Sequence, residues 1–224
     1  MTLPTGNRSP LSLDELRKHL GPLRPVNDGS PAAATLPTGT PSLDAMLGGG
    51  WPRGRIVEIA GAWSSGKTSP LFRSLAEVTR RRQLVAWIDA RGELYPPSAA
   101  TLGVDLERLL VVRPPPAPRG SALARAGEIV ARSAAFPLVV LDLPDGERLE
   151  DGAIARLRAA AGAGGAVIAA LTPRAGALAQ AAVKLEVDGD ELLLTKGGPG
   201  TAQRGFLQGG DALPRLDLVT RRHR

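Results

Sequence analysis

The residues with the clearest chemical signature in this sequence form the segment Gly61-Ala62-Trp63-Ser64-Ser65-Gly66-Lys67-Thr68. Its pattern G-x4-G-K-[ST] lets the backbone curl so that successive N–H groups point at phosphate oxygens. A helix that follows the segment adds the positive end of its dipole. Lys67 is then placed to reach the β and γ phosphates, and the Thr68 hydroxyl to ligate Mg²⁺. The alternative is a glycine-rich turn between a strand and a helix, with a surface lysine.

A magnesium site at such a loop also needs an acidic residue at the end of another apolar strand. Pro137-Leu138-Val139-Val140-Leu141-Asp142 provides one, and Asp142 would hold a Mg²⁺-bound water. We therefore predict ATP and Mg²⁺ as cofactors, with Thr68 and Asp142 at the metal. The residues predicted to bind the nucleotide within this loop are Gly61, Ser64, Ser65, Gly66, Lys67, Thr68 and Ser69.

Alternating strands and helices would position these groups. The predicted strands span residues 55–60, 84–89, 109–113, 138–142 and 166–171, and the predicted helices span residues 42–47, 67–83, 99–103, 121–135 and 154–161. Four further runs, at 183–187, 191–195, 205–208 and 216–220, are typical of antiparallel strands separated by Gly/Asp turns. The pattern predicts an α/β fold: a mostly parallel sheet with flanking helices and an antiparallel C-terminal extension.

The first 41 residues differ in character from the rest. Ser12 and Glu15 form a capping box for a short amphipathic helix that ends near Leu20. Residues 21–41 contain five prolines and three glycines, which is typical of a linker. We predict residues 1–41 as a helix with a linker, and residues 42–224 as the core domain with a β-rich end and a basic tail.

Composition excludes several kinds of protein. With no cysteine, the 224-residue chain cannot be a disulfide scaffold or use a thiol nucleophile. No signal peptide is recognised, and the longest apolar run, residues 159–171, is too short to span a bilayer. We therefore expect no membrane association and a cytoplasmic location.

The net charge of +6 favours an anionic partner such as single-stranded DNA, although an arginine-rich genome gives the same bias. The alternative for the basic residues is ordinary solvated surface charge. The candidates for contact with DNA or a partner are Arg174, Lys196, Arg204, Arg221, Arg222 and Arg224.

Residues 38–59, which lead into the phosphate loop, resemble the core of the bacterial RecA recombinases. The resemblance continues through Trp87-Ile88-Asp89-Ala90 and residues 102–110, and covers about residues 38–145. Within that superfamily, Gly48-Gly49-Gly50-Trp51-Pro52-Arg53-Gly54 and the small size most resemble ImuA, the RecA-like accessory proteins of the damage-induced mutasome. The resemblance implies a RecA-like P-loop NTPase core.

The sequence departs from that family at several functional positions. Arg91 stands where the family has the catalytic glutamate that aligns the attacking water, and an arginine cannot act as a general base. Glu93, two residues on, is the candidate substitute, so the predicted catalytic residues are Lys67, Asp142 and Glu93. Tyr95 replaces an aspartate that packs on adenine and is a candidate to stack on the base. Thr172 falls near the glutamine that senses the γ-phosphate.

The DNA-binding loops of the family are also short here, and its large C-terminal domain is absent, so we do not expect strand exchange. Lys196 lies near the place of family lysines that reach a neighbouring subunit's nucleotide. The resemblance implies an accessory role in translesion synthesis with ImuB and an error-prone polymerase as partners, and contact with RecA as a further possibility. Two alternatives stay open: a DNA-stimulated ATPase of the RecA class, and a scaffold that binds no nucleotide.

Overall fold

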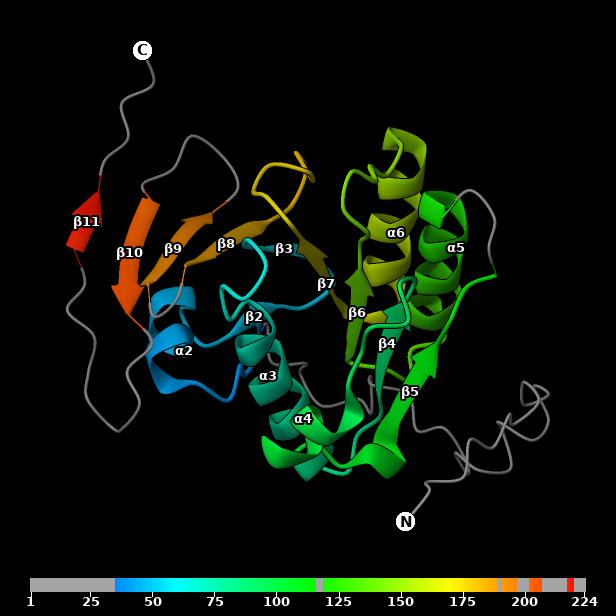
Figure 1. Ribbon diagram of the computed structural model, residues 1–224, viewed down its shortest axis with the longest axis horizontal. Coiled ribbons are helices and arrows are strands. Elements are labelled where there is room, and N and C mark those ends of the chain that lie inside the picture. Colours follow the sequence, from blue (N-terminus) through cyan, green and yellow to red (C-terminus); the bar gives the residue numbers. More distant parts are fainter. Residues whose placement is uncertain (1–34, 116–118, 189–190, 197–201, 207–216, 220–224) are drawn as a thin grey trace.

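The computed structural model describes residues 35–115, 119–188, 191–196, 202–206 and 217–219, and these residues build one large sheet with helices on both faces (Figure 1). Nine strands follow the spatial order β11-β10-β9-β8-β3-β7-β6-β4-β5. The strands β3 to β8 all run parallel, whereas β9, β10 and β11 are antiparallel. The mostly parallel α/β fold expected from the sequence is therefore confirmed.

The bounds of the elements in the large sheet agree closely with the sequence pattern. Its strands are β3 (Ile56–Ala60), β4 (Val85–Asp89), β5 (Leu109–Val112), β6 (Leu138–Asp142), β7 (Val167–Thr172), β8 (Val183–Asp188), β9 (Glu191–Lys196), β10 (Ala202–Phe206) and β11 (Asp217–Val219). The helices are α2 (Pro41–Leu47), α3 (Thr68–Arg80), α4 (Pro96–Thr101), α5 (Arg119–Arg132) and α6 (Asp151–Gly164), with a 3-10 turn at Leu106–Arg108. None of the helices in the described part of the chain is long and apolar enough to cross a membrane.

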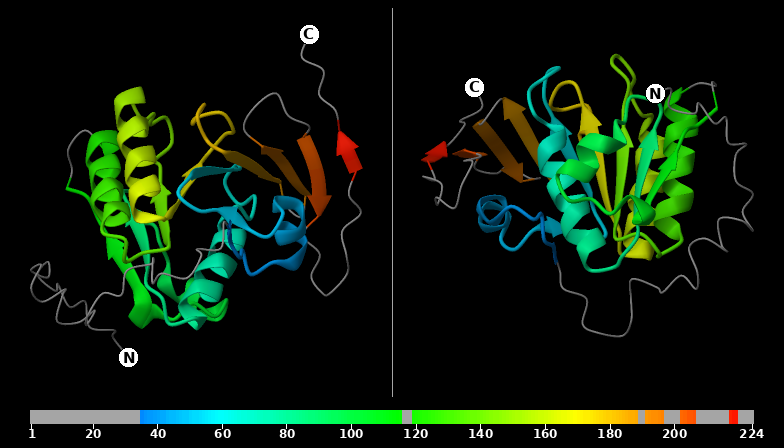
Figure 2. Two further views of the ribbon diagram at one scale, coloured as in Figure 1. Left: turned by 180° about the vertical axis from the view of Figure 1, so that it is seen from behind. Right: turned by 60° about the horizontal axis from the view of Figure 1, so that its bottom comes forward.

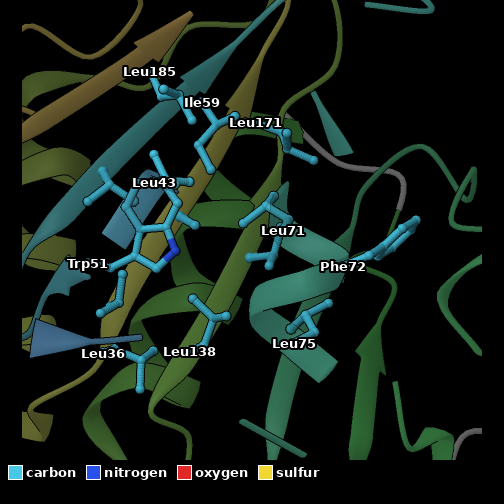
Figure 3. Packing of buried hydrophobic residues seen from close by; sticks show 14 of the residues in the cluster. Leu36, Leu43, Trp51, Ile59, Leu71, Phe72, Leu75, Leu138, Leu171 and Leu185 are labelled. Carbon is cyan, nitrogen blue, oxygen red and sulfur yellow. The ribbon is translucent and has the colours of Figure 1, made fainter. Parts of the chain in front are cut away.

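The central strands are buried on both faces, as parallel strands between helices must be. Helices α5 and α6 cover one face, and α2, α3 and α4 lie on the other (Figures 1 and 2). On β3, Val57 and Ile59 join the cluster under α3, while Ile56 joins the cluster under α5 and α6. Figure 3 shows the first cluster, in which Trp51 and Leu43 pack beside the helix α3.

The direction of strand β8 differs from the one predicted. Residues 183–187 were expected to be antiparallel, but β8 runs parallel to β3 and only its other neighbour, β9, is antiparallel. The alternating hydrophobicity has another cause: Val183, Leu185 and Val187 are buried under one layer, and Lys184 and Glu186 on the other face are only partly covered. Strand β10 also begins three residues before the predicted run at 205–208.

A small hairpin-like pair anchors the start of the described chain. The strand β1 (Thr35–Leu36) lies within the segment 21–41 and pairs antiparallel with β2 (Trp51–Pro52). Gly50 permits this approach, because its φ is +128° and a Cβ there would lie 2.2 Å from the carbonyl oxygen of Leu36. The predicted helix near residues 12–20 lies outside the described residues, so the domain boundary at residue 41 stays a prediction.

A buried polar network ties this anchor to the helix that follows the phosphate loop. The indole N–H of Trp51 donates to Ser74 Oγ at 3.0 Å, and that hydroxyl lies 3.0 Å from the carbonyl oxygen of Thr38. All three residues are buried. Because buried polar groups are costly unless paired, the network fixes α3, and with it the end of the phosphate loop, against β2.

Two glycines of α6 provide a matched test of the packing between α5 and α6. A Cβ on Gly164 would lie 2.0 Å from the carbonyl oxygen of Ala131 in α5, whereas a Cβ on Gly162 would meet nothing within 4 Å. We expect Gly164→Ala to lower the free energy of unfolding by about 1–3 kcal/mol, as overpacking does. Gly162→Ala should raise it by about 0.5–1 kcal/mol, because alanine is the better helix former. Urea unfolding of both variants measures this; equal effects would contradict the packing.

Candidate nucleotide site

The site forms where the carboxyl ends of the parallel strands meet. The phosphate loop follows β3, residues 91–95 follow β4, and Asp142 is the last residue of β6. The register pairs Asp89 with Asp142 and Ala60 with Thr172, so these strand ends lie at one level of the sheet. Parallel α/β sheets bind ligands at this edge.

The phosphate loop has the curled backbone that the motif predicts. Ser64 and Gly66 have φ values of +60° and +81°, in the left-handed region. The loop begins with a hydrogen bond from the Gly61 N–H to the carbonyl oxygen of Thr172 at 3.2 Å. Gly61 cannot carry a side chain, because a Cβ there would lie 2.2 Å from Ser65 Oγ. A Cβ on Gly61 would also lie 2.7 Å from the carbonyl oxygen of Val187, so packing against both the loop and β8 requires the first glycine of the motif.

A cavity of about 310 Å³ lies against this loop. The predicted site residues that it brings together are Ser64, Ser65, Gly66, Lys67, Thr68, Glu93, Tyr95 and Asp142. Gly61 lines a neighbouring groove instead. Ser69 does not line the cavity, and its N–H donates to the carbonyl oxygen of Gly66 at 2.9 Å. The cavity therefore joins the phosphate loop, the segment after β4 and the end of β6.

Lys67 of the phosphate loop and Asp142 at the end of β6 line the same cavity but lie in different surroundings. Lys67 Nζ donates to the carbonyl oxygen of Gly61 at 2.7 Å, so the ammonium folds back onto the first residue of the loop. Burial lowers the pKa of Lys67, and nearby Arg91 lowers it further. Asp142 is buried, and burial raises the pKa of its carboxyl from 3.8 to about 6, against the opposing effect of Arg91.

Arg91 is the centre of a cluster of charges at the cavity. Its Nε lies 2.9 Å from Glu93 Oε2, its Nη2 3.8 Å from Asp142 Oδ1, and its Nη1 3.7 Å from Asp145 Oδ1. Its guanidinium carbon lies 5.2 Å from the centre of the Trp63 ring, which is cation–π distance. Glu93, the predicted substitute for the missing glutamate, is thus held by the arginine that took the glutamate's place.

The chemistry of the cavity fits a nucleotide with magnesium. One end carries the loop amides, Lys67 and the oxygen ligands of Thr68 and Asp142, which is the donor set that phosphate and Mg²⁺ require. Apolar residues also line the cavity, among them Phe72 and Trp87, whose ring centroids lie 5.5 Å apart with the planes tilted by 34°. Two buried polar atoms, Ser65 Oγ and Trp87 Nε1, have no hydrogen-bond partner among the described residues. Such orphaned donors beside an open cavity favour a polar ligand.

Sequence reasoning missed several of these residues. Phe72 lies four residues after Thr68, so helical spacing alone places both on one face of α3. Trp63 is a variable position of the motif, and its indole N–H donates to Asp145 Oδ2 at 3.3 Å. Nothing in the sequence pointed to Asp145, because the contact joins two loops that are 82 residues apart.

Glu58 on β3 fixes the loop that follows β7. This buried carboxylate accepts hydrogen bonds from the N–H groups of Gly176 at 3.2 Å and Ala177 at 2.8 Å. Thr172 Oγ1 lies 3.2 Å from Glu58 Oε1 and 3.1 Å from the carbonyl oxygen of Arg174. Thr172, which falls near the family's γ-phosphate sensor, therefore has its hydroxyl engaged within the protein. The glutamate inside an apolar strand was the signal that sequence reasoning overlooked.

The structure places one of the basic candidates near the site. Arg174 is exposed and lines a groove of about 430 Å³ with Gly61, Ala62 and Asp188. Lys196 and Arg204 lie on β9 and β10, but their side chains are outside the described part. Arg221, Arg222 and Arg224 lie outside the described residues altogether.

The raised pKa of Asp142 gives a pH-dependent stability. Because the folded-state value of about 6 exceeds the ordinary 3.8, the folded protein binds a proton where the unfolded chain does not. Without Mg²⁺, the unfolding free energy should therefore rise by about 1 kcal/mol between pH 7.5 and pH 5, and Asp142→Asn should lack this rise. Urea unfolding of both proteins at the two pH values measures it. Identical pH dependence in both would mean that the carboxyl titrates normally.

The comparisons with known proteins agree with this geometry. Residues 20–145 match the RecA N-terminal domain. The chain is 44% identical over 135 residues to the protein RecA of Picosynechococcus sp., a match that covers 59% of this chain and 38% of that relative. It is 46% identical over 108 residues to the protein RecA of Prochlorococcus marinus strain MIT 9303, covering 48% of this chain and 28% of the relative. The match with each of these curated relatives spans well under half of the relative's length. Because the match to the domain family covers more than half of this chain, the chain belongs to the RecA N-terminal domain family.

Proposed function

We propose that this protein is a RecA-like, ATP-binding accessory protein of damage-induced translesion DNA synthesis that acts in the cytoplasm. In this role it bridges ImuB and an error-prone polymerase, with RecA or single-stranded DNA as a further contact. One observation carries the nucleotide part of the proposal: a single cavity unites the phosphate loop, Asp142 and Arg91. The cavity brings Lys67 and Thr68 of the phosphate loop together with Asp142, and Arg91 stands where the resemblance to RecA places a glutamate that aligns water.

The short connections at the same edge of the sheet support an accessory role over strand exchange. Between β6 and α6 lie residues 143–150, and residues 173–182 join β7 to β8. The second connection is held at Gly176 and Ala177 by the buried Glu58. A loop pinned by a buried carboxylate is poorly suited to rearrange around a DNA strand.

The proposed partners rest on the resemblance of residues 48–54 to ImuA. Purified ImuB passed over the immobilised full-length protein, with and without Mg²⁺–ATP and single-stranded DNA, tests them. We expect capture of ImuB by the wild type. An absence of capture under every condition would count decisively against the proposed adaptor.

A DNA-stimulated ATPase is the second candidate, because Glu93 lines the same cavity as Lys67. Its carboxylate, however, is directed at Arg91, because Glu93 Oε2 lies 2.9 Å from Arg91 Nε. The accessory role therefore predicts little or no ATP turnover.

Turnover measurements with and without single-stranded DNA separate the two candidates. We expect Glu93→Gln to leave the low basal rate of the wild type unchanged, because the Glu93 carboxylate is directed at Arg91. The control is Lys67→Ala, which removes the phosphate-loop cation and sets the background rate. A DNA-stimulated rate that falls sharply in both variants would establish the ATPase instead.

A further inference from the structure

We propose that Arg91 makes this site selective for a nucleoside triphosphate over a diphosphate, by supplying the cation that binds the γ-phosphate. The inference rests on the nucleotide binding proposed above and names the residue that reads the third phosphate. Arg91 lies two residues after the end of β4, and its side chain is 16% exposed. It lines the same cavity as residues 62–68 of the phosphate loop.

The guanidinium of Arg91 rests on the phosphate loop itself. Its carbon lies 5.2 Å from the ring centre of Trp63, which is the third residue of the motif. Its charge also contributes to lowering the pKa of Lys67. Two cations that repel each other therefore converge on one cavity, and an anion between them relieves that repulsion.

The present partners of Arg91 leave much of its hydrogen-bonding capacity unused. The distances from Nη2 to Asp142 and from Nη1 to Asp145 are 3.8 Å and 3.7 Å, too long for hydrogen bonds. Nε is buried and, although it lies 2.9 Å from Glu93 Oε2, is not aligned to hydrogen-bond with any described residue. The carboxylates thus compensate the charge of the guanidinium without saturating its planar set of N–H donors.

A terminal phosphate matches those donors. A guanidinium binds phosphate oxygens through two parallel, charge-assisted N–H···O bonds, and it stays protonated at every physiological pH. A nucleoside diphosphate lacks the third phosphate, so Arg91 would keep only the nearby carboxylates of Glu93, Asp142 and Asp145 as partners.

Calorimetric titration of the full chain with Mg²⁺–ADP and with a non-hydrolysable Mg²⁺–ATP analogue tests the inference. The wild type should bind the triphosphate analogue more tightly by about tenfold or more, the value of one or two charge-assisted hydrogen bonds. Arg91→Ala should abolish most of this preference and change the affinity for Mg²⁺–ADP little. Arg91→Lys should retain part of it, and Arg80→Ala, an exposed α3 arginine paired with Glu77, should behave as wild type.

Circular dichroism of each variant shows whether it is folded. If Arg91→Ala does not fold, Arg91→Lys, which keeps the positive charge but not the planar donor set, tests the inference in its place. The inference is overturned if Arg91 variants keep the wild-type preference, or if they weaken both ligands equally. Wild-type protein that binds neither nucleotide would overturn this inference together with the nucleotide part of the proposed function. A preserved triphosphate preference without capture of ImuB would instead refute the adaptor role alone.

Discussion

The balance of charge between two cations and a set of carboxylates controls this site. Lys67 and Arg91 face the cavity, and Asp142, Asp145 and Glu93 surround the arginine. A buried carboxylate such as Asp142 is expensive to ionise, which its raised pKa expresses, and a buried cation is stable only beside anions. A ligand that combines phosphates with Mg²⁺ matches both requirements, because the phosphates would pair with the two cations and the metal with the Asp142 carboxylate.

The same edge of the sheet connects the phosphate loop to the chain after β7. The Gly61 N–H bonds the carbonyl oxygen of Thr172, and Glu58, three residues before Gly61, holds the backbone of residues 176 and 177. These contacts stabilise the start of the loop and hold the connection between β7 and β8. One backbone hydrogen bond and one buried carboxylate thus link the start of the phosphate loop to the chain after β7.

Local patterns in the sequence predicted much of this structure, and tertiary contacts account for what they missed. The motif at residues 61–68 and the apolar run before Asp142 are contiguous, so their chemistry can be inferred without a fold. The direction of β8 could not, because alternating hydrophobicity describes how a strand is covered rather than which way it runs. The partners of Arg91 come from separate loops, and only the shared carboxyl edge of β4 and β6 brings them together.

Binding of a triphosphate by the phosphate loop should be visible in ligand-dependent thermal unfolding. The melting temperature of the full chain should rise with increasing Mg²⁺–ATP, as expected for a ligand that binds only the folded state. Lys67→Ala should lose this rise, while the exposed-site variant Arg80→Ala keeps it. A wild-type melting temperature that does not change at millimolar Mg²⁺–ATP would show that the loop does not bind this nucleotide and would favour a scaffold that binds none.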